Sequence, residues 1–298
     1  MEMSSGEEDY RRVVEETTVA SSWIEGTCIE IIGDLPPRRA PTHALFDFDG
    51  TLSLIREGWP EVMIPMMVEV LLATDTDETE EELSELVEAF VMELNGKQTL
   101  YQMMRLTKEV ARRGDAPEEP LAYKREYHRR LMDRIESRRA ALRNGEAAAD
   151  YLVPGSLSML EALQARGVQL HLASGTDGHF VLEEAELLGL DQFFGERIHG
   201  ALDDPGAFSK AQVIERILGD HAIDGESLVG FGDGFVEIQN IRETGGLAVA
   251  VASDESGRNG QPDVWKRSRL IGAGAHLVIP DFQMADQLVD FLFAPQRD

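Results

Sequence analysis

Residues 43–51 read His-Ala-Leu-Phe-Asp-Phe-Asp-Gly-Thr, and this stretch decides the fold. The run from His43 to Phe48 is short, mostly apolar and bounded by Pro41 and Gly50, a pattern typical of a buried strand in a parallel sheet. The strand ends in carboxylates, and α/β sheets place their active sites at the carboxyl ends of their strands. We therefore expect a parallel sheet with a functional site at this end.

The chain after residue 151 alternates between two patterns. Short apolar runs typical of buried strands are separated by stretches with helical spacing. Such alternation predicts a mostly parallel sheet with helices on both faces. The expected strands after the first are residues 168–173, 197–200, 227–231, 247–251 and 276–279. The predicted fold class is therefore α/β, with a Rossmann-like doubly wound parallel sheet as its core.

Residues 59–143 show helical periodicity instead, because their apolar residues recur at three- and four-residue spacing. This block is predicted to be all-helical and inserted after the first strand. The N-terminal segment begins polar and acidic, includes a possible short strand at 27–32, and ends in a linker at 35–39. The expected parts are an N-terminal extension, partly disordered, a core domain and an inserted helical domain: residues 1–40, 41–54 with 150–298, and 55–149, respectively.

Composition limits the classes of function. The formal net charge is −27, which should repel nucleic acid and anionic membranes at long range. No apolar run approaches the ~18 residues that span a bilayer, and the first residues carry no apolar secretion signal. Cys28 is the only cysteine, so an internal disulfide is impossible. We expect a soluble cytoplasmic protein that binds neither nucleic acid nor membrane, as a monomer or a homodimer.

One basic stretch departs from this acidic average. Residues 105–143 hold twelve Lys or Arg residues, which could form a nucleic-acid patch. Acidic residues are interleaved among them, however, and ion pairs on helix surfaces are the interpretation that we favour.

Asp47 and Asp49 form the first candidate site. Residues two apart on an extended segment point the same way, so both carboxylates can approach one ligand. Two close carboxylates repel each other and need a cation or a shared proton. The alternative is a simple turn, because Asp-Gly ends many strands.

Three further candidate sites follow predicted core strands. Ser174, in Ala-Ser-Gly-Thr, could bind an anion together with backbone N–H groups, or could simply cap a helix. Lys210 lies near a helix start, against the helix dipole, although a solvated lysine is the commoner case. Asp233 and Glu237, one helical turn apart, form a possible acidic pair for a hard divalent cation such as Mg²⁺.

The order of these motifs resembles the haloacid dehalogenase-like hydrolase superfamily. The matching elements are Asp-Phe-Asp-Gly-Thr at 47–51, Ala-Ser-Gly-Thr at 173–176, Lys210, and Gly-Asp-Gly-Phe-Val-Glu at 232–237. The chain looks like the phosphatase branch with a helical cap of the C1 type, as in phosphoglycolate phosphatases and β-phosphoglucomutases. One departure is Glu237, where the family usually has aspartate. Lys266 competes with Lys210 for the family's lysine position, but fits it poorly.

The resemblance implies roles for the matching residues. Asp47 would be the nucleophile that forms an aspartyl-phosphate, and Asp49 the general acid and then the general base. The cofactor Mg²⁺ would be held by Asp47, Asp49, Asp233 and Glu237, with Asp49 contributing its backbone carbonyl. Phosphate would be bound by Gly50, Ser174, Gly175 and Lys210. The acid at position 49 favours a phosphatase or a phosphomutase over a dehalogenase.

The inserted domain would then be the cap that selects the substrate. Candidate contacts in and beside its loops are Arg56, Trp59, Lys97, Gln98, Thr99 and Arg105. The sequence thus predicts a Mg²⁺-dependent phosphomonoesterase for a small phosphorylated metabolite, such as a sugar phosphate or a phosphoglycolate-like ester. A phosphomutase or other phosphoryl transferase, and a non-catalytic module that binds a phosphometabolite, are the alternatives.

Overall fold

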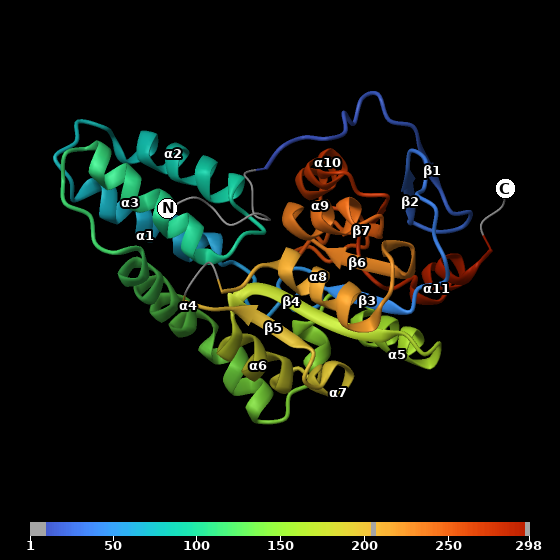
Figure 1. Cartoon of the computed structure of the whole chain (residues 1–298). Helices are drawn as coiled ribbons and strands as arrows, with labels where there is room; N and C mark the ends of the chain where they lie inside the picture. Colours follow the sequence, from blue (N-terminus) through green and yellow to red (C-terminus); the bar gives the residue numbers. More distant parts are fainter. Residues whose placement is uncertain (1–9, 204–206, 296–298) are drawn as a thin grey trace.

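The computed structural model describes residues 10–203 and 207–295 of the chain. Within these residues, an eight-stranded sheet forms the centre of the larger domain (Figure 1). Across the sheet, the parallel strands follow the order β8-β7-β6-β3-β4-β5. Their bounds are β3 (His43–Phe46), β4 (Gln169–Asp177), β5 (Ile198–Ala201), β6 (Leu228–Gly232), β7 (Leu247–Val251) and β8 (Leu277–Ile279). The predicted α/β class is confirmed.

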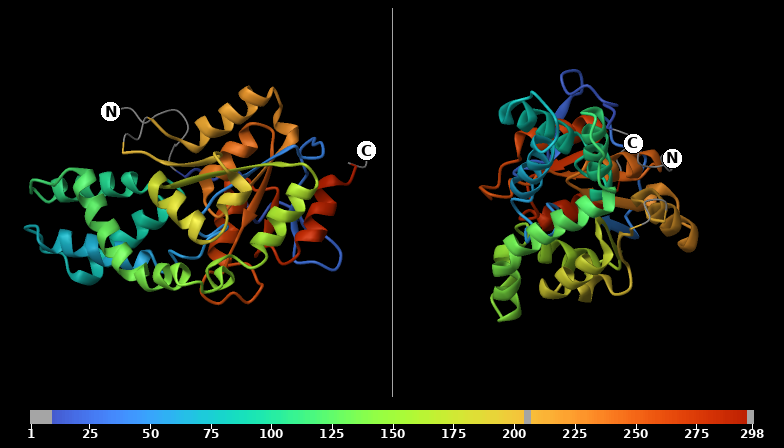
Figure 2. Two further views of the ribbon diagram at one scale, coloured as in Figure 1. Left: turned by 90° about the horizontal axis from the view of Figure 1, so that it is seen from below. Right: turned by 90° about the vertical axis from the view of Figure 1, so that its left-hand side faces the viewer.

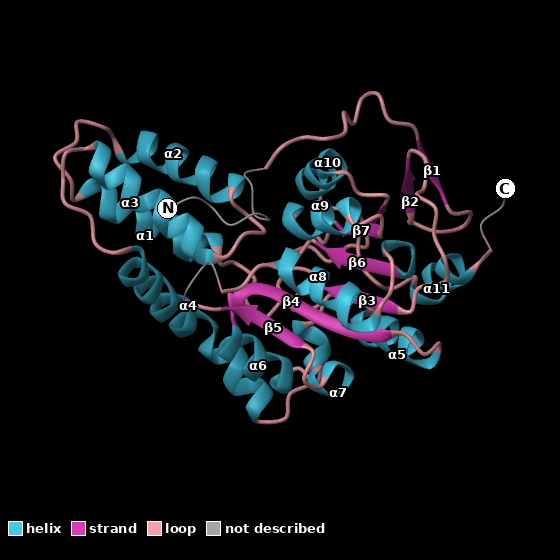
Figure 3. Ribbon diagram, viewed as in Figure 1, coloured by secondary structure: helices cyan, strands magenta, loops and turns pink. Residues whose placement is uncertain are grey.

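Helices cover both faces of this sheet (Figure 3). On β3, Ala44 and Phe46 belong to the apolar core on one face, whereas Leu45 belongs to the core on the other. This alternation follows from the two-residue period of a strand. The first face is covered by α5 (Ser156–Ala165), α6 (Gly178–Leu187), α7 (Asp191–Phe194) and α11 (Ala285–Phe293), and the second by α8 (Lys210–His221), α9 (Phe235–Glu243) and α10 (Val264–Ala273). The sheet is doubly wound, as predicted.

The chain between β3 and β4 forms the predicted helical cap. Its helices are α1 (Pro60–Leu72), α2 (Glu80–Glu93), α3 (Thr99–Arg112) and α4 (Pro120–Arg143). Their apolar faces form a separate core around Met67, Val87 and Leu106. Figure 2 shows these helices as a lobe at one end of the sheet. No helix in the described ranges combines the length and the apolar character that crossing a membrane requires.

The N-terminal segment contributes to the core sheet. β1 (Ser21–Trp23) pairs with β2 (Glu30–Ile32), which pairs with β8 in the antiparallel sense. Arg267 fastens β2 through two hydrogen bonds to the carboxylate of Glu30, of 2.6 and 2.8 Å. Part of the stretch predicted as an extension therefore forms the sheet edge, while its first nine residues lie outside the described residues.

Candidate active site

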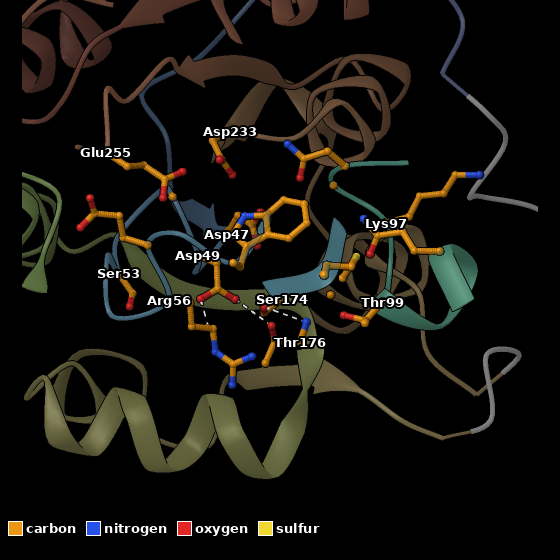
Figure 4. Close-up of a pocket in the computed structure, with 18 of the residues that line it drawn as sticks. Asp47, Asp49, Ser53, Arg56, Lys97, Thr99, Ser174, Thr176, Asp233 and Glu255 are labelled. Atoms are coloured by element: carbon orange, nitrogen blue, oxygen red, sulfur yellow. Dashed lines mark hydrogen bonds and ion pairs between the residues drawn. The ribbon is translucent and has the colours of Figure 1, made fainter. Parts of the chain in front are cut away.

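A cavity opens where the carboxyl ends of the central strands face the cap (Figure 4). Because β3 lies between β4 and β6, the ends of these three strands are adjacent. The predicted residues that line the cavity are Asp47, Asp49, Gly50, Arg56, Trp59, Lys97, Thr99, Ser174, Gly175, Lys210 and Asp233. The fold thus brings together residues that are far apart in sequence.

Asp47 lies at the end of β3 and is only 7 % exposed. Its Oδ1 accepts a hydrogen bond from the backbone N–H of Phe48 at 2.8 Å, and its Oδ2 lies 2.9 Å from the Lys210 Nζ. Burial raises the pKa of Asp47 well above its usual value, and Lys210 only partly opposes this. The carboxylate is therefore held in place by a buried cation, yet remains short of positive charge.

Lys210 is the first residue of α8, after the N-cap Ser209. Its Nζ also contacts the Glu237 Oε2 at 2.8 Å, while the Glu237 Oε1 accepts a hydrogen bond from the Gly234 N–H at 2.6 Å. Burial alone would lower the pKa of Lys210, but Asp47 and Glu237 outweigh it and the pKa is raised. A lysine at this helix start, unfavourable for the helix dipole, is thus balanced by two carboxylates.

Asp49 lies beside Asp47 but has different neighbours. Its Oδ2 accepts a hydrogen bond from the Thr176 hydroxyl at 2.7 Å (Figure 4). Burial raises the pKa of Asp49 to about 6, opposed mainly by Arg56, whose Nε lies 3.8 Å from the Asp49 Oδ1. At neutral pH this carboxyl can therefore exchange a proton with a ligand.

Arg56 is bound more closely to the core than to Asp49. Its Nε and Nη2 donate to both carboxylate oxygens of Glu184 on α6, at 2.8 and 2.9 Å. Both side chains are buried, so this bidentate ion pair anchors the first hinge of the cap.

Asp233 follows β6 and is paired with Lys266. The Lys266 Nζ lies 2.8 Å from the Asp233 Oδ2, 2.7 Å from the Glu255 Oε1 and 3.0 Å from the Ser253 Oγ. Sequence reasoning placed Lys266 away from the site and did not name Glu255 or Ser253. The available signal was their position, because both follow β7 at the same edge of the sheet as the other site residues.

The backbone of the first motif approaches Asp233 closely. Gly50 has a φ of +72°, and a Cβ at this position would collide with the Asp233 carboxylate. A glycine is therefore required both by the backbone conformation and by the space. The Gly50 carbonyl also accepts a hydrogen bond from the Ser253 hydroxyl at 2.5 Å, which ties the first motif to the loop after β7.

The residues present fit a hard divalent cation. Carboxylate oxygens of Asp47, Asp233 and Glu237 lie within 4.8 Å of one another. Both oxygens of Glu237 already contact Lys210 or Gly234, so Asp47 and Asp233 are the more available ligands. The Asp49 Oδ1 is buried without a hydrogen-bond partner. An all-oxygen set with excess negative charge matches Mg²⁺ better than a soft metal.

Ser174 lies inside β4, which extends to Asp177 rather than ending at Ala173 as predicted. The strand pairing shifts register between Ser174 and Asp177, so this end of β4 is irregular. The Ser174 Oγ accepts a hydrogen bond from the Thr176 N–H at 3.1 Å (Figure 4). Ser174 caps no helix, because α6 begins only at Gly178 and has Asp177 as its N-cap.

The cap candidates divide into two groups. Lys97, Thr99 and Trp59 line the cavity, whereas Arg105 does not: its Nε is 2.9 Å from the Glu109 Oε1 on the same helix. Gln98 is buried and donates to the Phe208 carbonyl at 2.8 Å. The interpretation of the basic stretch as ion-paired agrees with the structure, in which Glu126 pairs with two arginines.

The loop between α2 and α3 touches the core. A Cβ added to Gly96 would lie 3.0 Å from the Cα of Gly234, and one on Gly234 would lie 2.7 Å from the Cα of Gly96. Two glycines thus allow the cap loop to meet the motif that carries Asp233. The cavity is closed on this side by backbone contact.

Comparisons with known proteins agree with this geometry. A family model described as haloacid dehalogenase-like hydrolase matches residues 41–245, more than half of the chain. The sequence has no significant match among curated proteins.

Several solved structures share the fold. A predicted phosphoglycolate phosphatase from Haemophilus somnus 129PT is 18 % identical, with a TM-score of 0.54 over 84 % of this chain and 97 % of that one. A β-phosphoglucomutase from Clostridium difficile is 13 % identical, with a TM-score of 0.57 over 85 % and 97 %. A predicted phosphatase from Clostridium acetobutylicum is 15 % identical, with a TM-score of 0.53 over 86 % and 100 %. At these identities the likeness concerns the fold alone.

Proposed function

Because the chain belongs to the haloacid dehalogenase-like hydrolase family, we propose that it is a Mg²⁺-dependent phosphomonoesterase for a small phosphorylated metabolite. The observation that carries the proposal is the pairing of two unlike carboxyl groups in one cavity. Asp47 is held against a buried lysine, while Asp49 lies against a neutral hydroxyl and has a pKa of about 6. One group suits nucleophilic attack and the other suits proton transfer.

In the first half of the reaction, an Asp47 carboxylate oxygen attacks phosphorus in line. The bond between phosphorus and the ester oxygen breaks, and that oxygen takes the proton of Asp49. Ser174, Lys210 and the N–H groups of Gly50 and Gly175 bind the phosphoryl oxygens. The product alcohol leaves, and the phosphoryl group remains on Asp47.

In the second half, Asp49 accepts a proton from a water molecule, whose oxygen attacks phosphorus. The bond between phosphorus and Asp47 breaks, which releases inorganic phosphate and restores both carboxyl groups. Asp47 and Asp233 would hold Mg²⁺, with the Asp49 carbonyl and Glu237 as further candidate ligands. When bound, the ion supplies charge that offsets the crowded carboxylates and the phosphoryl oxygens.

The cavity's cap-side walls support a small substrate. Trp59, Lys97 and Thr99 line the cavity, and the glycine contact between Gly96 and Gly234 closes one side. A phosphorylated protein loop would need a more open site. Lys97 offers a cation to a second anionic group, so a carboxylated or sugar phosphate fits the proposal.

The test measures phosphate release from a panel of sugar, nucleotide and small organic phosphates, with Mg²⁺ and with EDTA. We expect Mg²⁺-dependent release by the wild type and none above background by Asp47→Asn. Asp290→Asn is the matched control, because that carboxylate is exposed and pairs only with Arg166 on the surface. Absence of release from every compound by folded protein would contradict the hydrolase proposal, and transfer of phosphate between sugar positions would favour a mutase.

A further inference from the structure

A second cluster of ionisable side chains lies at the opposite end of the sheet. His43 begins β3, His171 is on β4 and His221 ends α8. The ring centroids of His43 and His221 are 4.5 Å apart, those of His43 and His171 5.6 Å, and those of His171 and His221 5.9 Å. One ring nitrogen from each lies within 4.8 Å of the others. The mechanism proposed above uses none of the three.

The strand period explains why these rings meet. His43 shares a face of β3 with Leu45, and His171 shares a face of β4 with Ala173. Leu45 and Ala173 belong to the core beneath α8, so both histidines point to the side of the sheet that α8 covers. The third ring comes from the last residue of that helix.

His171 is the member that lacks an explanation as a packing residue. It is 3 % exposed, and its Nε2 is buried with no hydrogen-bond partner in the described part of the chain. A buried polar nitrogen left unpaired is unfavourable by about 1–3 kcal/mol. A bound cation would satisfy this nitrogen.

The other two rings meet the remaining requirements of a metal site. His43 contacts the Thr42 hydroxyl through Nδ1 at 3.0 Å and the Gln169 Oε1 through Nε2 at 2.9 Å. If one nitrogen binds a metal, the other keeps a neutral partner that fixes the ring, as is usual for metal-ligating histidines. His221 is exposed, so the cluster is open to solvent for entry of an ion.

The protonation state of the cluster is also suitable. Burial lowers the pKa of His171 to about 3, with further lowering from His43, Arg197, His221 and His199. Burial likewise lowers the pKa of His43. Both rings are therefore neutral at pH 7, the form that binds metals. Arg197 disfavours a cation nearby, but its Nε is committed to the Leu170 carbonyl at 2.8 Å.

We propose that His43, His171 and His221 form a binding site for one transition-metal ion of the zinc class. Three imidazoles and an open position for water match the ligand sets of zinc and its neighbours, and disfavour Mg²⁺. The ion would tie the end of α8 to β3 and β4. α8 carries Lys210 at its other end, about 18 Å away at 1.5 Å per residue, so the ion would brace the helix that positions this lysine.

The test uses Co²⁺ as a coloured probe, with Mg²⁺ in excess to saturate the acidic cavity. We expect one Co²⁺ per wild-type chain, with visible d–d absorption bands, and displacement of the colour by Zn²⁺. His221→Ala should weaken this binding by at least about 10–100-fold, the range found for lesser changes around metal sites. His221 is exposed at a helix end, so this variant should fold normally.

His179→Ala is the matched control, because His179 is also exposed and lies outside the cluster. It should keep the full Co²⁺ spectrum. Zn²⁺ should also raise the melting temperature of the wild type and of His179→Ala, but not that of His221→Ala, because an ion that binds only the folded state stabilises it. No stoichiometric Co²⁺ binding, or binding that survives His221→Ala unchanged, would overturn the proposal.

Discussion

The two ends of strands β3 and β4 carry polar clusters of opposite character. At the carboxyl ends, buried carboxylates outnumber the buried lysines, and every described contact of Lys210 and Lys266 in the site is to a carboxylate or a hydroxyl. At the amino ends, the cluster consists of imidazoles, and burial keeps His43 and His171 neutral. The same sheet thus separates a charged site from a neutral one.

The difference teaches how burial acts on different side chains. Burying a carboxylate is tolerated only with a cation or a proton, so the charged end needs lysines and invites a divalent ion. Burying a histidine is tolerated by loss of its proton, so the neutral end needs no counter-charge. The first end should depend on charge balance, and the second on proton and soft-metal binding.

Lys210→Met should produce the largest effect, because it removes the cation shared by Asp47 and Glu237. We expect kcat for phosphate release to fall by about 10²–10³-fold, as when one preorganised group for transition-state charge is lost. Steady-state kinetics on the best substrate measures this. Circular dichroism and the melting temperature serve to show that the variant is folded. Unchanged kcat would remove Lys210 from the site.

Lys266→Met should act differently, although Lys266 is equally buried. Its loss leaves Asp233 and Glu255 without their cation, which makes the pocket more negative. We expect a lower half-saturating Mg²⁺ concentration, by roughly tenfold, as Coulomb attraction at short range implies. A Mg²⁺ titration of activity measures the shift. Lys266→Arg is the control that keeps the charge, and a rise in the Mg²⁺ requirement of Lys266→Met would contradict this role.

The fold could be predicted from local patterns, whereas parts of the site could not. The switch from helical spacing in residues 59–143 to alternating strands and helices is visible in the sequence, so the cap and the doubly wound core were predicted correctly. The pairing of β2 with β8 joins segments about 250 residues apart, and no local pattern reports such a contact.

Site residues followed the same rule. Asp47, Ser174 and Asp233 end or follow core strands, which is a positional signal that one sequence can carry. Lys266 reaches the cavity from the start of α10 only because the loop after β7 folds back, and its partner Glu255 lies in that loop. The histidine cluster was missed because its members are far apart in sequence and meet only through strand register.

The neutral end of the sheet predicts a pH effect on stability. The pKa of His171 is about 3 in the folded chain and about 6.5 when unfolded, so the unfolded state binds the proton first. Stability is therefore fully present above pH ~6.5 and is lost as pH falls from there toward 3. His171→Phe removes this group and should flatten the dependence.

Urea unfolding midpoints at pH 7 and pH 5, in EDTA, measure the change. His128 and His276 also have lowered pKa values, of about 3 and about 4, and remain in both proteins, so only the difference between wild type and His171→Phe isolates His171. Equal pH-dependent losses in both proteins would show that the neutral end is not formed as described.

The smallest effect should mark the boundary of the charged end within the cap. Lys97 and Arg105 are both cap cations proposed from sequence, but only Lys97 lines the cavity. Lys97→Ala should raise KM for the best substrate by about three- to fivefold, the effect of one weak ion pair. Arg105→Ala should leave KM within about twofold, because its guanidinium is held by Glu109 on the same helix. Steady-state kinetics of the two variants side by side decides the point, since an equal rise in KM for both would mean that the substrate reaches α3 and that the cavity extends further into the cap.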